Sequence, residues 1–592
     1  MNDVLFQEVE QPVVEHPAKH MSYMDELFGR ADVILRQHRL ENPDLYQMVE
    51  ERKAIKEANG KKAMISQAAI SQEVANASVS KLPQLVESIY FKQFKQKELM
   101  AKIRASHQII HEHYIETQSL IVPRTQSRNI KQPYSSIEEM TADRADKLSS
   151  QIQAWRSILP ILINRFSKIQ DPRRAKSVKH QIAVVMLYGL LAFIFRLSSR
   201  REINRELSNI VIFENLQKIF PELESIPHAD TLARLLEKIN VNDIEKTHIL
   251  LINQLIRNKK FKKLLISGCL PIAIDGTQKI YRDGELHDLR WLSRKVGGEE
   301  AGQMQQYVYV LEANIVFKNG LAIPLLTEYL KTDLNVLNNP EGKQDCELVA
   351  FERLSAKLKK YFPRLKIMMV ADALFATQSI LEILAQYRWE YVIQFSRNKL
   401  KRFTELLNSK RDTAQAIPGQ TYYRERQQEF YWYNDVTWGY DWQLKIHLIS
   451  CVEKWQEADK KSGEIISKYS QHQWISSIRI NIENVHELCN LGARKIGLME
   501  DSINTEKHRG YHYEHAFSYN FNAMQGFHLL MRIAHAVNAL SEFTKKIKKW
   551  IKEQGCSATL KLIKETIFNP WLSKEWYEKE IKKPIRLTLQ LE

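Results

Sequence analysis

The chain has 592 residues, which is more than one compact core normally supports, so two to four domains are expected. Its formal net charge is +16, because 86 Lys and Arg outnumber 70 Asp and Glu. This excess favours a polyanionic partner, such as DNA, RNA or an anionic membrane surface. The hydrophobic fraction of 44% and the mean hydropathy of −0.39 are those of a globular protein, and they exclude disorder over most of the length.

The cysteines and the apolar segments indicate where the protein works. The five cysteines include no CxxC pair, which argues against a zinc or disulfide framework and favours a reducing, cytoplasmic compartment. The N-terminus lacks the basic start and apolar core of a secretion signal. The most apolar run, Ile182 to Phe195, is shorter than the roughly 20 residues that a spanning helix needs. We therefore predict a buried core helix there and no membrane partner.

The N-terminal half is predicted to be helical. Residues 1–120 have apolar side chains at helical spacing and form a possible DNA-binding region, followed by a proline-containing linker at 121–135. Three histidines in this region, His107, His111 and His113, suggest either a metal site or, more simply, solvated or DNA-facing side chains. Residues 136–265 again read as helices and form a second domain with a possible role in binding DNA ends. Its basic run at 257–263 is either a phosphate contact or a solvated connection.

The periodicity changes at residue 266. A short apolar strand, CLPIAI, is followed by Asp275, and two more strands are joined by a turn at Asn319-Gly320. A helix, a strand with Asp372 near its end, a second helix and a fifth strand complete residues 266–396. This order is that of an RNase H-like α/β fold, whose mixed sheet places the ends of the first and fourth strands side by side. Asp275 and Asp372 are therefore expected to meet.

The second half of the chain interrupts and then completes this core. Residues 397–473 are rich in Tyr, Trp and β-branched side chains and predict an inserted β-rich subdomain. Residues 474–520 resume the core and contain one helix running from Val485 to Lys507. Residues 521–592 are predicted to be helical, with a cluster of lysines between 545 and 552 that either binds DNA or solubilises the helix.

The predicted helix after the insertion supplies a third carboxylate. Glu500 and Lys507 are seven positions apart, so a helix presents both on one face. Glu506 and Glu514 compete with Glu500 for this role, but Glu506 points away from the Glu500 face and Glu514 lies beyond the break suggested by Gly510. Two strand-end carboxylates and one from a facing helix can hold two Mg²⁺ or Mn²⁺ ions about 4 Å apart, an arrangement that cleaves phosphodiesters.

The segments IAIDGTQ, VADALFAT and MEDSINTEKHRGYHYEH resemble those of a known family. They are similar to segments of the DDE transposases of bacterial insertion sequences, of the cut-and-paste type with a β-rich insertion, and the resemblance spans roughly residues 140–545. It implies that Asp275, Asp372 and Glu500 are the catalytic and metal-binding triad, with two Mg²⁺ or Mn²⁺ ions as cofactors. The pattern departs from the family at Ile496, where an arginine is common, and the tyrosine that precedes that arginine is absent.

The same resemblance implies the DNA contacts and the reaction. Lys507 corresponds to a lysine that contacts the terminal phosphate, Arg494 to an arginine ahead of the glutamate, and His512 lies in the Gly-Tyr-His-x-Glu-His segment. Trp438, like Trp432 and Trp442, either stacks on a flipped base or packs in the core of the insertion.

The implied activity is cleavage of double-stranded DNA at terminal inverted repeats and joining to target DNA, by a homodimer associated with the bacterial nucleoid. A nuclease or resolvase that does not join DNA, or a domesticated DNA-binding protein, is the alternative.

Overall fold

The computed structural model describes residues 134–592 apart from short gaps. The described ranges are 134–284, 290–296, 303–331, 345–409, 422–424, 426–439, 443–458, 465–585 and 587–590. Predictions for the helical region 1–120, for its three histidines and for nearly all of the linker lie outside these residues. Residues 134–592 form one compact unit by their own contacts.

A bundle of helices precedes the sheet, as predicted for residues 136–265. It comprises α6 (Ile137–Phe166), α7 (Ile182–Ile194), α8 (Arg200–Leu207), α9 (Ile210–Ile219), α10 (Ala229–Lys238) and α11 (Val241–Arg257). Every residue of α7 is buried, which confirms the predicted core helix. None of the helices in the described part of the chain is long and apolar enough to cross a membrane.

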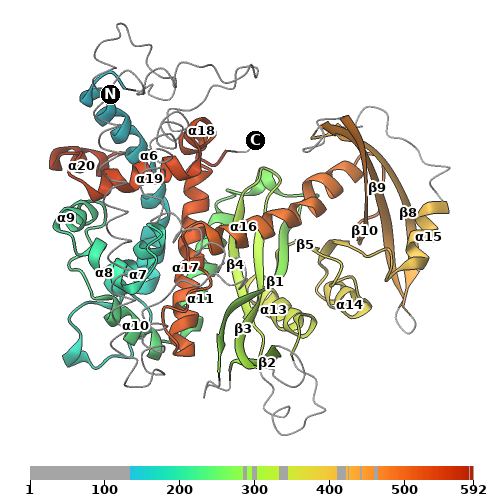
Figure 1. The fold of residues 1–592 in the computed structure, drawn as a ribbon, viewed down its shortest axis with the longest axis horizontal. Coiled ribbons are helices and arrows are strands. Elements are labelled where there is room, and N and C mark those ends of the chain that lie inside the picture. Colours follow the sequence, from blue (N-terminus) through green and yellow to red (C-terminus); the bar gives the residue numbers. More distant parts are fainter. Residues whose placement is uncertain are drawn as a thin grey trace, which may run out of the picture. The chain divides into compact units, whose positions relative to one another are not determined.

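The core sheet has the predicted mixed order. Its strands are β1 (Leu270–Asp283), β2 (Leu292–Val296), β3 (Gln303–Val316), β4 (Ala322–Tyr329), β5 (Ile367–Ala371) and β6 (Glu390–Gln394). The central order is β4-β3-β1-β5-β6, with β1, β5 and β6 parallel and β3 antiparallel to both β1 and β4. This is the arrangement of an RNase H-like core (Figure 1). Strand β2, which pairs with the first residues of β3, was not predicted.

The turn between β3 and β4 forms where the sequence predicts it. Gly320 has a φ of 91°, a left-handed conformation that glycine adopts without steric cost. The Asn319 side-chain oxygen accepts from the backbone N–H of Leu321 at 3.2 Å. An Asn-Gly pair therefore specifies the hairpin through its local chemistry.

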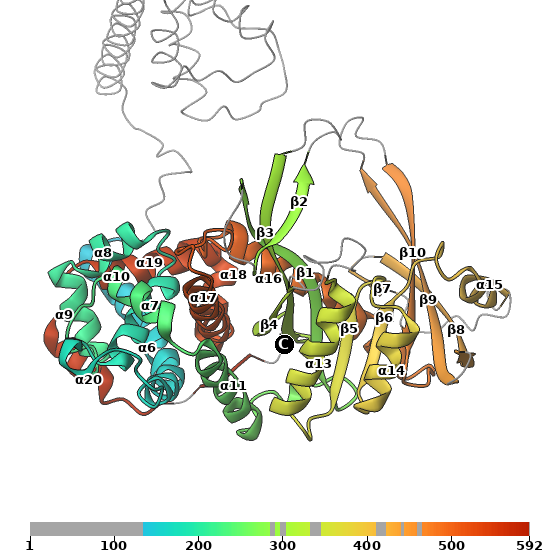
Figure 2. The same ribbon diagram turned by 90° about the horizontal axis from the view of Figure 1, so that it is seen from below.

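The insertion is rich in β-strands, as predicted, and these strands extend the core sheet. It contains α15 (Lys401–Ser409), β7 (Tyr422–Tyr423), β8 (Arg426–Trp438), β9 (Leu444–Ala458) and β10 (Ile465–Ser476). Residues Trp474 to Ser476 of β10 pair antiparallel with β6, so the sheet continues from the core through β10, β9, β8 and β7 (Figure 2). The predicted end of the insertion at residue 473 falls within the last strand.

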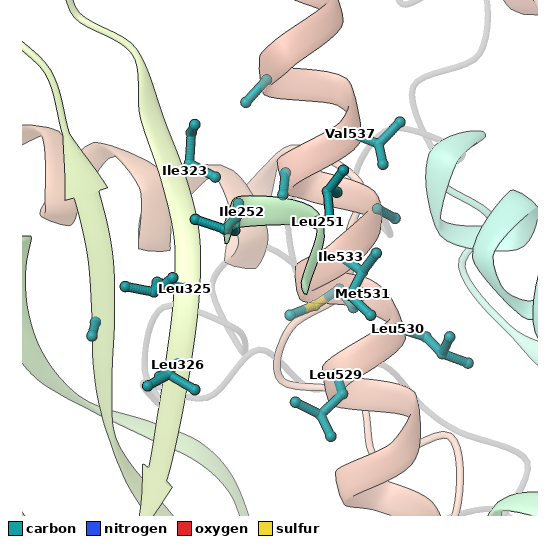
Figure 3. Packing of buried hydrophobic residues seen from close by; sticks show 14 of the residues in the cluster. Leu251, Ile252, Ile323, Leu325, Leu326, Leu529, Leu530, Met531, Ile533 and Val537 are labelled. Carbon is teal, nitrogen blue, oxygen red and sulfur yellow. The ribbon is translucent and has the colours of Figure 1, made fainter. Parts of the chain in front are cut away.

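Helices cover both faces of the core sheet. Helices α13 (Glu347–Tyr361) and α14 (Gln378–Gln386) lie on one face, and α16 (Ile496–His508) and α17 (Phe521–Glu542) lie on the other (Figure 2). Met499 and Ile503 of α16 pack in a buried cluster with Ala273 of β1 and Val370 of β5. Leucines and isoleucines of α17, α11 and β4 pack together beside it (Figure 3). This packing fixes α17 between the helical bundle and the sheet.

The helix that carries Glu500 begins later than predicted. The chain forms a π-helical turn at Glu487–Gly492 and a 3₁₀ turn at Ala493–Lys495, and α16 starts only at Ile496. The lysine-rich segment is likewise a separate helix, α18 (Lys545–Gln554), followed by α19 (Cys556–Phe568) and α20 (Lys574–Ile581). All five cysteines are free thiols in the structure.

Candidate active site

Asp275 lies on β1, and Asp372 directly follows the end of the neighbouring parallel strand β5. The β1–β5 pairing ends at Ala273 and Val370, and each aspartate lies two residues beyond that last pair. Because side chains alternate along a strand, both aspartates belong to the face on which Ala273 and Val370 contact α16. Asp275 was expected to end its strand, but β1 continues to Asp283 because it stays paired with β3.

Glu500 comes to this face from α16. It is exposed and lies next to Met499, which is buried against Ala273 and Val370. The structure therefore brings the three predicted carboxylates to one region, from two strands and one helix.

Burial and neighbouring carboxylates raise the pKa of Asp275. The pKa of Asp275 is raised from 3.8 to about 6, first by burial, then by the negative charge of Asp372, and further by Glu347 and Glu500. A carboxyl group surrounded by three others resists ionisation unless a cation compensates the charge. Glu347, at the start of α13, was not predicted; its carboxylate lies against Gly276 and accepts a hydrogen bond from Tyr309 Oη at 2.6 Å.

Asp372 precedes a helix without capping it. Helix α14 begins at Gln378 with Thr377 at its N-cap, so Asp372 is not the capping residue. Its Oδ1 accepts from the backbone N–H of Leu374 at 3.0 Å, which is a local turn that fixes the orientation of the carboxyl group.

The two competing glutamates are engaged elsewhere. Glu506 is fully buried, with Arg532 Nη1 at 3.2 Å and His535 Nδ1 at 2.7 Å from its carboxylate. Glu514 pairs with Lys507 at 3.1 Å. These contacts favour Glu500 as the third carboxylate of the region.

The predicted DNA-contacting cations already have acidic partners. Lys507 pairs with Glu514, and its side chain is 18% exposed. Arg494 is 15% exposed and lies 2.8 Å from Glu453 of β9, with its guanidinium 5.6 Å from the ring centroid of Trp474. Arg494 therefore connects the insertion to the segment before α16. A phosphate contact by Lys507 stays a prediction, and it requires Glu514 to release the ammonium group.

The remaining predicted contacts are partly buried. His512 has a positive φ of 52°, and burial lowers the pKa of its imidazole. Trp438, at the end of β8, packs edge-on against Phe403 of α15 with ring centroids 5.1 Å apart. This favours the core-packing alternative for Trp438. Trp442 lies outside the described residues.

The donor chemistry of the region suits a hard divalent cation, since it offers carboxylate oxygens only. Within the described residues, no group of three His, Cys, Asp or Glu side chains is arranged to hold a metal ion. The other carboxylates are thus near enough to raise the pKa of Asp275 without being gathered at ligand distance. The raised pKa of Asp275 is the observation that fits a cation, because positive charge there would relieve the repulsion.

The raised pKa predicts a pH-dependent effect on stability. The contribution of Asp275 is favourable below its unfolded pKa of 3.8 and is lost as the pH rises through about 6, where the buried carboxyl ionises. Asp275→Asn should therefore raise the melting temperature by roughly 2–4 °C at pH 8 without divalent cations, and by less at pH 5. Asp501→Asn, which alters an exposed carboxylate of α16, is the control for thermal unfolding at both pH values. Equal shifts for the two variants would contradict the prediction.

Sequence reasoning missed a set of buried polar residues behind α16, including Arg532, Glu312 and Asn314. A signal was present, because Arg532 interrupts the apolar run FHLLMRIAHAV and Glu312 interrupts the apolar strand VYVLEANIVF. Charged residues in such runs are seldom buried without a partner.

Comparison with known proteins identifies one segment. Residues 163–251 match a protein-family model described as DDE_Tnp_1-associated. This segment runs from the end of α6 into α11 and lies directly before the sheet. No curated protein matches the chain. The match therefore links this segment, and not the whole chain, to a domain associated with DDE transposases.

Proposed function

We propose that this protein is a DDE transposase that cleaves DNA at the ends of a mobile element and joins those ends to target DNA. One observation carries the proposal: Asp275 and Asp372 lie two residues beyond the last β1–β5 pair, on the face covered by the helix of Glu500, and the negative charge of Asp372 contributes to the raised pKa of Asp275. The transposase-associated segment at 163–251 and the net charge of +16 support it.

Asp275, Asp372 and Glu500 would hold the divalent cations. When bound, Mg²⁺ or Mn²⁺ would activate a water molecule and stabilise the leaving oxygen of the phosphodiester. The protein orients the ligands: Asp275 is fixed by the β1–β3 ladder, and Asp372 by its bond from Leu374. Lys507, on the same helix as Glu500, would hold a DNA phosphate after exchanging its partner Glu514.

A joining assay separates this function from that of a nuclease. Duplexes are taken from the DNA that flanks the gene, with a free 3′-hydroxyl already exposed, and incubated with the full chain, Mg²⁺ and a supercoiled plasmid. We expect plasmid molecules covalently linked to the duplex. Cleavage of uncut duplexes without any joined product would instead indicate an RNase H-fold nuclease or resolvase.

The proposal would be overturned if the protein formed no joined product and also showed no cleavage that depends on Asp275. Asp275→Asn, run in parallel, must remove both cleavage and joining for the assay to report on this site.

A further inference from the structure

A buried arginine connects the two sides of the candidate active site. Arg532, on α17, is 2% exposed. Its guanidinium lies 3.1 Å from the carboxylate of Glu312 and 3.2 Å from that of Glu506, and it donates to Asn314 Oδ1 at 2.7 Å. Both glutamates are fully buried. One side chain of α17 thus binds strand β3 and helix α16 at the same time.

The partners of Arg532 are the neighbours of the candidate ligands. Glu312 is the direct cross-strand partner of Asp275 in the β1–β3 pair, so the two side chains share a face of the sheet. Glu506 lies on α16, less than two turns after Glu500. A single guanidinium therefore bridges β3, the strand paired with that of Asp275, and α16, the helix that carries Glu500.

Further hydrogen bonds hold α16 to the same place. Asn314 donates to Ser502 Oγ of α16 at 2.9 Å, and His535 of α17 contacts Glu506 at 2.7 Å. Tyr513, just after α16, donates to Glu312 at 2.8 Å. Every one of these partners is buried. The contacts reach the second half of the helix and the loop that follows it.

The segment that leads into α16 is not a regular α-helix. It consists of a π-helical and a 3₁₀ turn, and such turns replace the regular hydrogen bonding that would otherwise extend the helix rigidly. The position of Glu500, in the second turn of α16, therefore depends on what holds the rest of that helix.

The charges of the cluster persist in the folded protein. Burial alone would raise the pKa of Glu312 and of Glu506, but the adjacent Arg532 lowers both, so the carboxyls stay ionised. Burying these ions costs free energy that an apolar contact between α17 and the sheet would not cost. Paired ions, however, hold the elements that carry them in one geometry. An orienting role accounts for a charged cluster at this position better than stability does.

We propose that Arg532 is a positioning residue: it sets α16, and with it Glu500, relative to the β1–β3 strand pair that carries Asp275. This inference rests on the proposed function, because it assigns Glu500 to the cation site. Arg532 itself does not contact the cation or the DNA.

The test uses Glu506→Gln, since removing Arg532 could prevent folding. The matched control is Glu328→Gln, because Glu328 of β4 is 3% exposed and pairs with Arg353 at 2.7 Å and Lys357 at 2.8 Å on α13, on the other face of the sheet. Both variants neutralise one buried carboxylate that pairs with a cation of a neighbouring helix, and both are expected to lower the melting temperature. Only Glu506→Gln should weaken Mn²⁺ binding to the full chain, measured by calorimetry, by about tenfold.

A double-substitution cycle shows whether the effect passes through Glu500. In the Glu500→Gln background, adding Glu506→Gln should cause no further loss of Mn²⁺ affinity. Equal Mn²⁺ affinity for Glu506→Gln and Glu328→Gln, or additive losses in the cycle, would overturn the inference while leaving the proposed function intact. If Asp275→Asn bound Mn²⁺ and cleaved DNA as the wild type does, the proposed function would be wrong. This inference, which rests on that function, would then be wrong too.

Discussion

Asp275→Asn, Asp372→Asn and Glu500→Gln should each reduce Mg²⁺-dependent cleavage of end DNA by roughly a thousandfold or more. Each variant keeps the size of the side chain but removes the negative charge with which it would hold a cation. The three losses should not add, because ligands of one site act as a unit. Single-turnover cleavage of duplexes from the DNA flanking the gene measures the effect. Binding of the same duplexes should change by less than about threefold, since the fold and the basic surface are retained.

Glu347→Gln is the control for this prediction. Glu347 also raises the pKa of Asp275, but its carboxylate lies against Gly276, which faces the other side of β1 from Asp275. Removing this charge alters the local potential without removing a predicted ligand, so the loss should stay below about tenfold. Full activity in Asp275→Asn, Asp372→Asn or Glu500→Gln would contradict the site. A loss in Glu347→Gln as large as theirs would show that charge alone, rather than ligation, explains the effect.

Local chemistry made the core sheet predictable from the sequence. The short apolar strands, the amphipathic helices between them and the Asn319-Gly320 turn each indicate one element, and their order allows few topologies. The segments that lead into Asp275 and Asp372 were expected side by side, and the β1–β5 register shows this, although β1 continues past Asp275. The sequence also predicted that Glu500 and Glu506 point to different sides of their helix. In the structure Glu500 is exposed and Glu506 is buried.

Contacts between distant segments were not predictable. Arg494 was expected to contact DNA, but it pairs with Glu453, which lies 41 positions earlier in the sequence on a strand of the insertion. Strand β1 continues past Asp275 because β3 pairs with it as far as Asp283, although the segment TQKIYRD reads as polar. Its Lys279 is buried and donates to the backbone carbonyl of Tyr513. Such residues look like surface residues until the folded chain supplies their partners.

The buried cluster behind α16 leads to the second large effect. Arg532→Met should destabilise the protein by about 3–5 kcal/mol, because Glu312 and Glu506 would remain buried without the guanidinium that compensates them. Arg353→Met is the control, since Arg353 also pairs with two carboxylates but is 27% exposed, and its loss should be markedly smaller. Thermal unfolding of the full chain, followed by calorimetry, compares the two variants.

The neutral triple variant separates stability from positioning. Arg532→Met combined with Glu312→Gln and Glu506→Gln removes the guanidinium together with the two carboxylates that it compensates, so most of the lost stability should return. Mn²⁺ affinity should not return with it, because the replacement contacts no longer impose one position on α16. A triple variant that recovers both would assign the cluster to stability alone, whereas an Arg532→Met protein that melts like the wild type would show that the two glutamates need no compensation.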